Sequence, residues 1–304
     1  MRRNYNIIGG RLTEVEDEQA LVAVYVNPQE SEKRYLVDTL KLDEHTLNSA
    51  LDPDELGRLE FEPEHVAIIF KRPKRYSQQD QFLFRVASVG AFLFKERLIV
   101  VISEDAPLFD TAQIVRSTLP SHILLRLIYR SIFHFLEHLK VISVISDDLQ
   151  DKISRAMENK HLLNLFTLEK SLVYYLNSIN SNGMVLEKLR LNAPKIGLTT
   201  EQMELLDDTI IENTQCFKQA EIYSNILASL MDARASIVSN NLNVLMKTLN
   251  ILTITIMVPT LVVSVFSMNV RLPLQEHPFA FWIIAGIATV SLLTVVYFWR
   301  RKWW

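Results

Sequence analysis

The sequence predicts an α+β membrane protein. We expect a cytoplasmic α/β domain with a mixed sheet, a helical region, and a very long stalk helix that continues into the first of two C-terminal transmembrane helices. Three observations carry this prediction. Two long uncharged apolar runs end the chain, short β-type runs fill its first third, and no proline or glycine occurs between Gly197 and Pro259.

The two apolar runs predict membrane spans. No charged residue occurs from 248 to 270 or from 279 to 298. An α-helix of about 20 apolar residues crosses the hydrocarbon core of a bilayer. The two spans then frame an extracytoplasmic loop at 271–278, and the second span, at 279–299, leads into a basic cytoplasmic tail at 300–304.

Basic residues predict the orientation in the membrane. Arg300, Arg301 and Lys302 follow the second span and Lys247 precedes the first, whereas the loop between them holds only Arg271. Lys and Arg are enriched on the cytoplasmic side of membrane proteins. The amino-terminal segment also lacks the apolar core of a signal peptide. We therefore expect a multi-pass protein of the cell (inner) membrane, embedded in membrane lipid, with both termini in the cytoplasm.

Composition and motifs argue against several kinds of site and function. Cys216 is the single cysteine, which excludes an internal disulfide and a cysteine-built zinc site. A net charge of −3 argues against nucleic acid as a partner, because domains that bind it are usually basic. The sequence has no glycine-rich phosphate loop, nucleophile elbow or Cys/His pair, so we do not expect an enzyme.

Residues 1–105 are predicted to form the cytoplasmic α/β domain. Five runs are short, rich in β-branched and aromatic residues, and bounded by turn residues or charges, as strands are. Residues 42–56 have helical spacing between them, and the strand order cannot be read. The five runs are YNIIG at 5–9, ALVAVYV at 20–26, HVAIIFK at 65–71, FRVASVG at 84–90 and RLIVVIS at 97–103.

Residues 106–198 are predicted to be helical. Apolar residues recur at intervals of three and four from Asp110 to Asn180. We expect Asn182-Gly183 to break this helix and Ala193-Pro194, with Gly197, to end the segment that follows.

Residues 199–270 are predicted to form the stalk and first transmembrane helix. Thr199 and Gln202 have the spacing of a capping box. A helix from there into the first span has more than about 60 residues and a length close to ~100 Å. So long a helix needs other helices to pack against, so we expect a homo-oligomer.

The first span carries a polar stripe. Its members follow one another at intervals of three or four, which places them on one helical face. A polar face is costly in lipid, so it should meet another helix or water. Packing by small polar residues is one interpretation, and a water-filled path, favoured by the two amides, is the other. The stripe consists of Asn243, Met246, Asn250, Thr253, Met257, Thr260 and Ser264.

At this point the chain resembles a known family. The segment NVLMKTLNILTITIMVPTLVVSVFSMN is followed by a short loop, a second span and the tail YFWRRKWW. This arrangement resembles the CorA family of divalent cation channels, whose hallmark is Gly-Met-Asn at the end of the first span. Here the tripeptide is Ser267-Met268-Asn269.

The resemblance implies a homopentamer for passive uptake of divalent cations, Mg²⁺ above all and sometimes Co²⁺ or Ni²⁺, without a further cofactor. It places Asn269 at the outer mouth, Asn243 in a ring at the inner end of the pore and Thr260 in a ring deeper in the membrane. It also implies an apolar gate and a regulatory Mg²⁺ site between subunits. The gate residues are Met246, Leu249 and Met257, and the regulatory acids are Asp208 and Asp232.

The chain departs from the family pattern in several places. Ser267 replaces the glycine of the tripeptide, and Asn48-Ser49 stands where the partner acid of the regulatory site is expected. The loop holds one acid, Glu276, followed by His277, which suits a transition metal better than Mg²⁺. Two alternatives therefore remain: a zinc, nickel or cobalt transporter of the same fold, and a membrane-tethered scaffold that has lost transport.

One further motif is set aside. His134, Glu137 and His138 fit the H-x-x-E-H pattern of some zinc proteases. The sequence shows no clear third ligand, and the pattern arises easily on a charged helix face.

Overall fold

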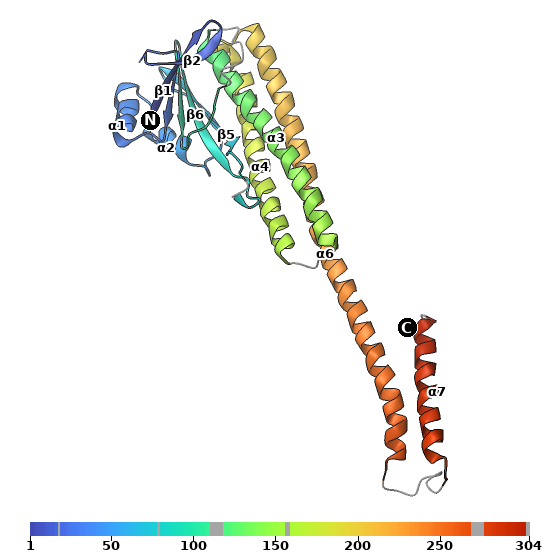
Figure 1. The fold of residues 1–304 in the computed structure, drawn as a ribbon. Coiled ribbons are helices and arrows are strands. Elements are labelled where there is room, and N and C mark those ends of the chain that lie inside the picture. Colours follow the sequence, from blue (N-terminus) through green and yellow to red (C-terminus); the bar gives the residue numbers. More distant parts are fainter. Residues whose placement is uncertain (18, 78–79, 110–117, 156–158, 269–276, 302–304) are drawn as a thin grey trace. The chain divides into compact units, whose positions relative to one another are not determined.

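The computed structural model describes residues 1–17, 19–77, 80–109, 118–155, 159–268 and 277–301 (Figure 1). The chain divides into two compact units, Met1–Met231 and Asp232–Trp304. Helix α6, Thr200–Phe266, begins in the first unit and ends in the second. The two units are described separately below.

The first unit is built on a seven-stranded sheet, which is mixed as predicted. The strand order is β2-β1-β3-β7-β6-β5-β4. The pair β3 and β7 is parallel, and the other neighbours are antiparallel. The strands are β1 Arg2–Ile8, β2 Arg11–Val15, β3 Val22–Val26, β4 Arg58–Phe61, β5 His65–Pro73, β6 Val86–Phe94 and β7 Leu98–Ile102.

The five predicted strands are confirmed as β1, β3, β5, β6 and β7, and the two strands that were missed are the edges of the sheet. β2 reads RLTEV and β4 reads RLEF, and both are largely half-buried or exposed. An edge strand buries less apolar surface than a central one, so its sequence carries a weaker strand signal.

Helical layers cover both faces of the sheet. Alternate residues of a strand point to opposite faces, and in β3 the side chains of Val22 and Val24 join one buried cluster while Ala23 and Tyr25 join another. The first cluster includes residues of α3, α4 and α6, and the second includes residues of η1 and α2. The helices of this unit before α6 are α1 Glu30–Arg34, the π-helix η1 Tyr35–Thr39, α2 Glu44–Leu51, α3 Pro120–Arg155, α4 Asn159–Leu191 and α5 Ala193–Ile196.

The predicted break at Asn182-Gly183 is wrong, because α4 runs through both residues. The side-chain oxygen of Asn182 accepts the Lys71 backbone N–H at 2.7 Å, and its side-chain nitrogen donates to the Lys71 carbonyl at 2.9 Å. A Cβ on Gly183 would lie 3.0 Å from Nδ2 of Asn213 in α6. Both residue types are common in turns, but here they serve packing. Asn182 bonds to the backbone of β5, and Gly183 lets α4 and α6 approach each other.

The start of α6 is confirmed. Gln202 N–H donates to the Thr199 hydroxyl at 3.3 Å, and Thr199 N–H donates to the Gln202 side-chain oxygen at 3.0 Å. Both bonds satisfy backbone donors that the first helical turn leaves free. The helix is 67 residues long and includes Pro259, which confirms the long helix that the missing helix breakers predict.

The second unit holds two helices that are long and apolar enough to cross a membrane. They are Ser239–Phe266, the last part of α6, and α7 Ala280–Arg300, each with a mean hydropathy of 2.1. Neither apolar window is buried within the chain. Such surfaces are stable only in lipid or against other apolar helices.

Candidate ion pathway

The polar stripe lies on the uncovered side of α6. Each of its seven members and Leu249 is exposed; the exposed fractions of the apolar members are large, with 57% for Met246 and 63% for Met257. Packing of the stripe against the described part of its own chain is therefore excluded. Another chain, lipid or water must face it.

The half-buried positions of the same helix recur on the opposite side. Ile251, Thr255, Pro259 and Val262 are half-buried, and at ~100° per residue they point away from the stripe. The helix thus has one partly covered side, while the stripe and residues outside it, such as Leu252, Ile256 and Val263, are exposed. Asn241, an amide near the start of the candidate span Ser239–Phe266, lies on the half-buried side.

The threonine hydroxyls of the stripe have a fixed hydrogen-bonding role. Thr253 Oγ1 donates to the Leu249 carbonyl at 2.8 Å and Thr260 Oγ1 donates to the Ile256 carbonyl at 2.7 Å. A hydroxyl has one proton to donate and two lone pairs. Since the proton is used within the helix, each oxygen presents only acceptor capacity to the uncovered side.

The end of the span is described as far as Met268. Ser267 N–H donates to the Val263 carbonyl at 3.1 Å, and its hydroxyl donates to the Ser264 carbonyl at 2.9 Å. The described non-glycine residues with positive φ are Asn27, Lys41, Gln81 and Phe82. Ser267 therefore adopts a backbone conformation that does not require glycine. Asn269, predicted at the outer mouth, lies outside the described residues.

The loop histidine lies at the start of α7. The Phe279 backbone N–H donates to Nδ1 of His277 at 3.3 Å. This bond satisfies one of the free N–H groups at a helix start, and it gives His277 a structural contact. Glu276, the single acid of the loop, lies outside the described residues.

The predicted regulatory residues do not form a site within one chain. Asp208 is exposed in the first unit and Asp232 is exposed in the second. Asn48 is exposed, while Ser49 is buried and accepts a hydrogen bond from Nη2 of Arg58 at 2.6 Å. Within the described ranges no group of three or more His, Cys, Asp or Glu residues can hold a metal ion. A metal ion at Asp208 would need ligands from another chain.

The H-x-x-E-H residues serve the core of the first unit. His138 is buried, and its Nδ1 is hydrogen-bonded to the Tyr175 hydroxyl at 2.6 Å. Burial, and to a smaller extent the charge of His134, lowers the pKa of His138 to about 4. The imidazole is therefore neutral and hydrogen-bonded inside the domain, which gives it a structural role in the core.

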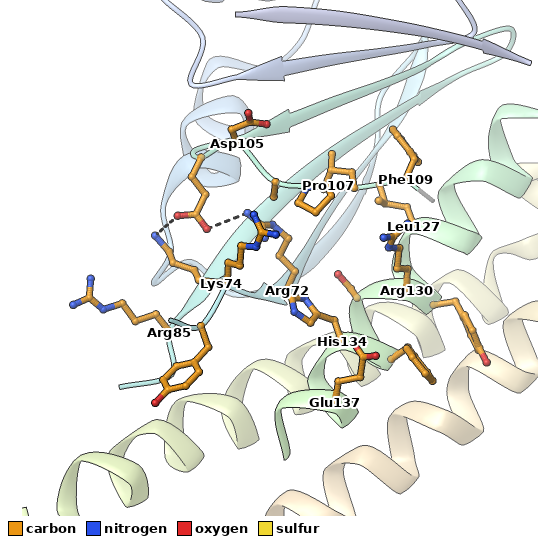
Figure 2. Close-up of a pocket in the computed structure, with 18 of the residues that line it drawn as sticks. Arg72, Lys74, Arg85, Asp105, Pro107, Phe109, Leu127, Arg130, His134 and Glu137 are labelled. Carbon is orange, nitrogen blue, oxygen red and sulfur yellow. Dashed lines mark hydrogen bonds and ion pairs between the residues drawn. The ribbon is translucent and has the colours of Figure 1, made fainter. Parts of the chain in front are cut away.

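Sequence reasoning did not single out a cavity in the first unit. It lies beside α3, with a volume of about 710 Å³, and Arg72 and Arg130 are among the residues that line it (Figure 2). The run KRPKR at 71–75 is the one signal in the sequence that points to this place.

Comparisons with known proteins agree with this architecture. The family model described as CorA-like Mg²⁺ transporter protein matches residues 23–302. The cobalt/magnesium transport protein CorA of Methanocaldococcus jannaschii is 24% identical over 311 residues, which cover 98% of this chain and 96% of that protein.

Solved structures share the fold. The complete CorA magnesium transporter of M. jannaschii matches with a TM-score of 0.79 at 21% identity, over 100% of this chain and 98% of that chain. The full-length CmaX protein matches with a TM-score of 0.69 at 17% identity, over 99% and 97% of the two chains. The ZntB cytoplasmic domain of Vibrio parahaemolyticus matches with a TM-score of 0.61 at 12% identity, over 78% of this chain and 98% of that domain. Because the family match spans nearly the whole sequence, this chain belongs to the CorA family of divalent cation transporters, a membrane protein family of ion transporters and not of enzymes.

Proposed function

We propose that this chain forms a homopentameric channel through which hydrated Mg²⁺ passes into the cytoplasm along the polar stripe of α6. The observation that carries the proposal is the position of the stripe, on the side of the helix that the described part of the chain leaves uncovered. Five copies with this side inward place the stripe around a central path. The names of the M. jannaschii relative, a cobalt/magnesium transport protein, support a divalent cation as the cargo.

The chemistry of the stripe suits an ion that keeps its water. Water molecules around a cation turn their hydrogens outward, so the wall of the path needs hydrogen-bond acceptors. Thr253 and Thr260 present oxygen atoms whose protons are already donated within the helix, and Asn250 adds an amide oxygen. Mg²⁺ gives up its water reluctantly, and no carboxylate of the stripe competes for direct contact with the ion.

Apolar side chains of the same side supply the gate. Met246, Leu249 and Met257 are exposed next to the polar members. A ring of such side chains excludes water when it is narrow, and a hydrated dication cannot pass a dry constriction. Widening the ring readmits water and the ion together.

The direction of transport follows from the membrane potential. Two positive charges that move inward through ~100 mV gain about 4.6 kcal/mol, so uptake needs no other energy source. In this proposal both termini are cytoplasmic and the protein lies in the inner membrane. Asn269 forms the outer mouth, and Asp208 and Asp232 bind a regulatory Mg²⁺ between neighbouring subunits.

The proposal is tested by paired substitutions of equal chemistry on the two sides of α6. Asn250→Leu removes an amide from the stripe, and Asn241→Leu removes one from the half-buried side. In cells that depend on this protein for Mg²⁺ uptake, we expect Asn250→Leu to reduce influx about tenfold and Asn241→Leu to leave it near the wild-type rate. Equal rates in the two variants, at equal amounts of protein in the membrane, would exclude the stripe as the path.

The choice of ion is a separate question. His277, whose imidazole suits a transition metal, and the name of the M. jannaschii relative, a cobalt/magnesium transport protein, favour a transition metal as the alternative cargo. Competition of Mg²⁺ influx by Co²⁺ and Zn²⁺, with and without a pH gradient, separates a Mg²⁺ channel from a zinc, nickel or cobalt transporter. Absence of influx for all three ions would identify a scaffold without transport.

A further inference from the structure

The cavity of the first unit lies between the sheet and α3. Figure 2 shows side chains that reach it from two directions: Arg72 and Lys74 from the end of β5, and Arg130 and His134 from α3. All of these residues belong to the first unit. At about 710 Å³ the cavity has the size of a small-molecule site, since such sites range from about 300 to 1,000 Å³.

Positive charge exceeds negative charge in the lining. Glu104 is shared between two cations, with Oε1 at 3.1 Å from Arg72 Nη2 and Oε2 at 3.0 Å from Lys74 Nζ. One carboxylate therefore forms ion pairs with two cations. The lining contains the cations Arg72, Lys74, Arg75, Arg85, Arg126 and Arg130 and the acids Asp80, Glu104, Asp105 and Glu137.

Two guanidinium groups of the lining have unused donors in buried positions. Arg72 is only 5% exposed, and its Nε makes no hydrogen bond, although its two terminal nitrogens bond to Glu104 and to the Pro73 carbonyl. Nη1 of Arg130 is also buried without a partner. A buried donor without an acceptor is costly, and native proteins rarely keep one without a reason.

The pKa of His134 reflects the positive charge of the neighbouring arginines. Burial lowers its pKa, the Glu137 carboxylate opposes this, and the charges of Arg72 and Arg130 lower the pKa further. Both guanidinium groups are therefore close enough to His134 for electrostatic interaction. An anion placed there relieves the repulsion among them and accepts from the unused donors.

Apolar and aromatic side chains form the rest of the cavity wall. Leu127 and Phe109 are buried or half-buried beside the charged groups, and Tyr129 is half-buried on α3. Phe133, on the same helix, is 48% exposed. Aromatic rings that are open to solvent stack with nucleic acid bases, a contact that tolerates any base.

We propose that this cavity binds a nucleotide, with its phosphates held by Arg72 and Arg130 and its base against the aromatic side chains of α3. Arginine suits this role because its guanidinium group carries five N–H donors, and Nε of Arg72 and Nη1 of Arg130 have no partner of their own. Nothing in this site depends on the ion pathway, so the test of one proposal does not decide the other.

Binding is measured by calorimetry on the purified full chain in detergent, with ATP, adenosine and inorganic pyrophosphate as probes. Mg²⁺ is left out, because ATP chelates it. We expect ATP to bind saturably at one site per chain, pyrophosphate to bind more weakly and adenosine more weakly still.

Three variants locate the site. Arg130→Gln should weaken both ATP and pyrophosphate about tenfold, because it removes the donor to the phosphates. Phe133→Ala should weaken ATP and leave pyrophosphate unchanged, because it removes only the stacking surface. Lys140→Gln is the matched control: Lys140 is an exposed cation of the same helix outside the cavity lining, and its loss should change neither affinity.

Several results would overturn the proposal. They are the absence of saturable ATP binding to the wild type, adenosine binding as tight as ATP, and equal affinities of Arg130→Gln and Lys140→Gln for ATP. Pyrophosphate binding as tight as ATP would refute the role of the base. Thermal unfolding of each variant shows that a loss of binding is not a loss of fold.

Discussion

At the scale of single residues, several polar side chains of the first unit are fixed by backbone partners in other elements. Asn182 is fully buried on α4 and bonds in both directions to the backbone of Lys71. β4 pairs with β5 only as far as Ile69, so the edge of β5 has no strand beside Lys71. The helix supplies the missing partner with a side-chain amide.

Asn182→Ala should therefore destabilise the first unit. It leaves a buried N–H and a buried carbonyl without partners, at a cost of about 2–4 kcal/mol in the free energy of unfolding. Asn180→Ala is the control, because Asn180 is exposed on the same helix. Thermal unfolding of the detergent-solubilised chain compares the two. A loss of stability no larger in Asn182→Ala than in Asn180→Ala contradicts the role given to the amide.

A buried histidine makes the stability of the first unit depend on pH. The pKa of His138 is lowered to about 4, mainly by burial, from an ordinary value of 6.5. The unfolded chain binds this proton more readily than the folded chain does, so its contribution to stability is complete above about pH 6.5 and is lost as the pH falls towards 4. The full effect is about 3 kcal/mol.

The variant His138→Asn isolates this contribution. The asparagine side-chain amide can hydrogen-bond to Tyr175 in place of Nδ1, but it does not titrate. The midpoint of urea unfolding should fall more steeply between pH 6.5 and 4.5 in the wild type than in the variant. Parallel pH profiles for the two proteins would show that His138 remains accessible to protons.

Ser267 gives a prediction about the family motif. Its backbone is outside the positive φ region, so Ser267→Gly restores the family residue without relieving strain. We expect Mg²⁺ influx and the preference for Mg²⁺ over Co²⁺ to change by less than about twofold. A large gain in either one would mean that the serine restricts the mouth of the path. The comparison is made in the same cells, at matched expression.

At the scale of elements, α6 was the most predictable part of the molecule. A capping box marks its start, and the long stretch without helix breakers predicts its continuity. The uncharged run marks its apolar end. The edge strands β2 and β4 were missed because half of their surface stays polar. The break expected at Gly183 was wrong because the same residue type serves a turn or a close helix contact, and only the neighbour, Asn213 of α6, decides which.

The candidate site was predictable only as a pattern, and its role stays a prediction. Periodicity alone placed the stripe on one face of the helix, and the structure shows that this face is uncovered. Sequence could not indicate Arg72 and Arg130 as a pair, because β5 and α3 lie far apart in the chain and meet only in the fold.

The proposed gate belongs to the element scale, because it depends on which side of α6 a residue occupies. Met257→Thr places a hydroxyl in the apolar ring, which lowers the cost of water there. We expect a severalfold rise in resting Mg²⁺ influx. Val258→Thr, on the half-buried side, makes a similar chemical change and should leave resting influx unaltered. Equal leak in both variants, or in neither, contradicts the gate.

At the scale of the whole molecule, the two units present different surfaces. The first unit has buried cores on both sides of its sheet, whereas the two spans of the second leave their apolar windows uncovered within the chain. Lipid and neighbouring copies are the partners that stabilise such helices. In the proposed pentamer, neighbouring copies would cover part of this uncovered surface.

The most direct test of the proposed function is Mg²⁺ influx into liposomes that contain the purified chain and a Mg²⁺-sensitive dye. A potassium diffusion potential, negative inside, supplies the driving force. We predict an influx that requires the protein, grows with the potential and needs neither ATP nor a pH gradient. Influx no faster than in protein-free liposomes, with the chain folded and correctly inserted, would contradict the assignment of this protein as a Mg²⁺ channel.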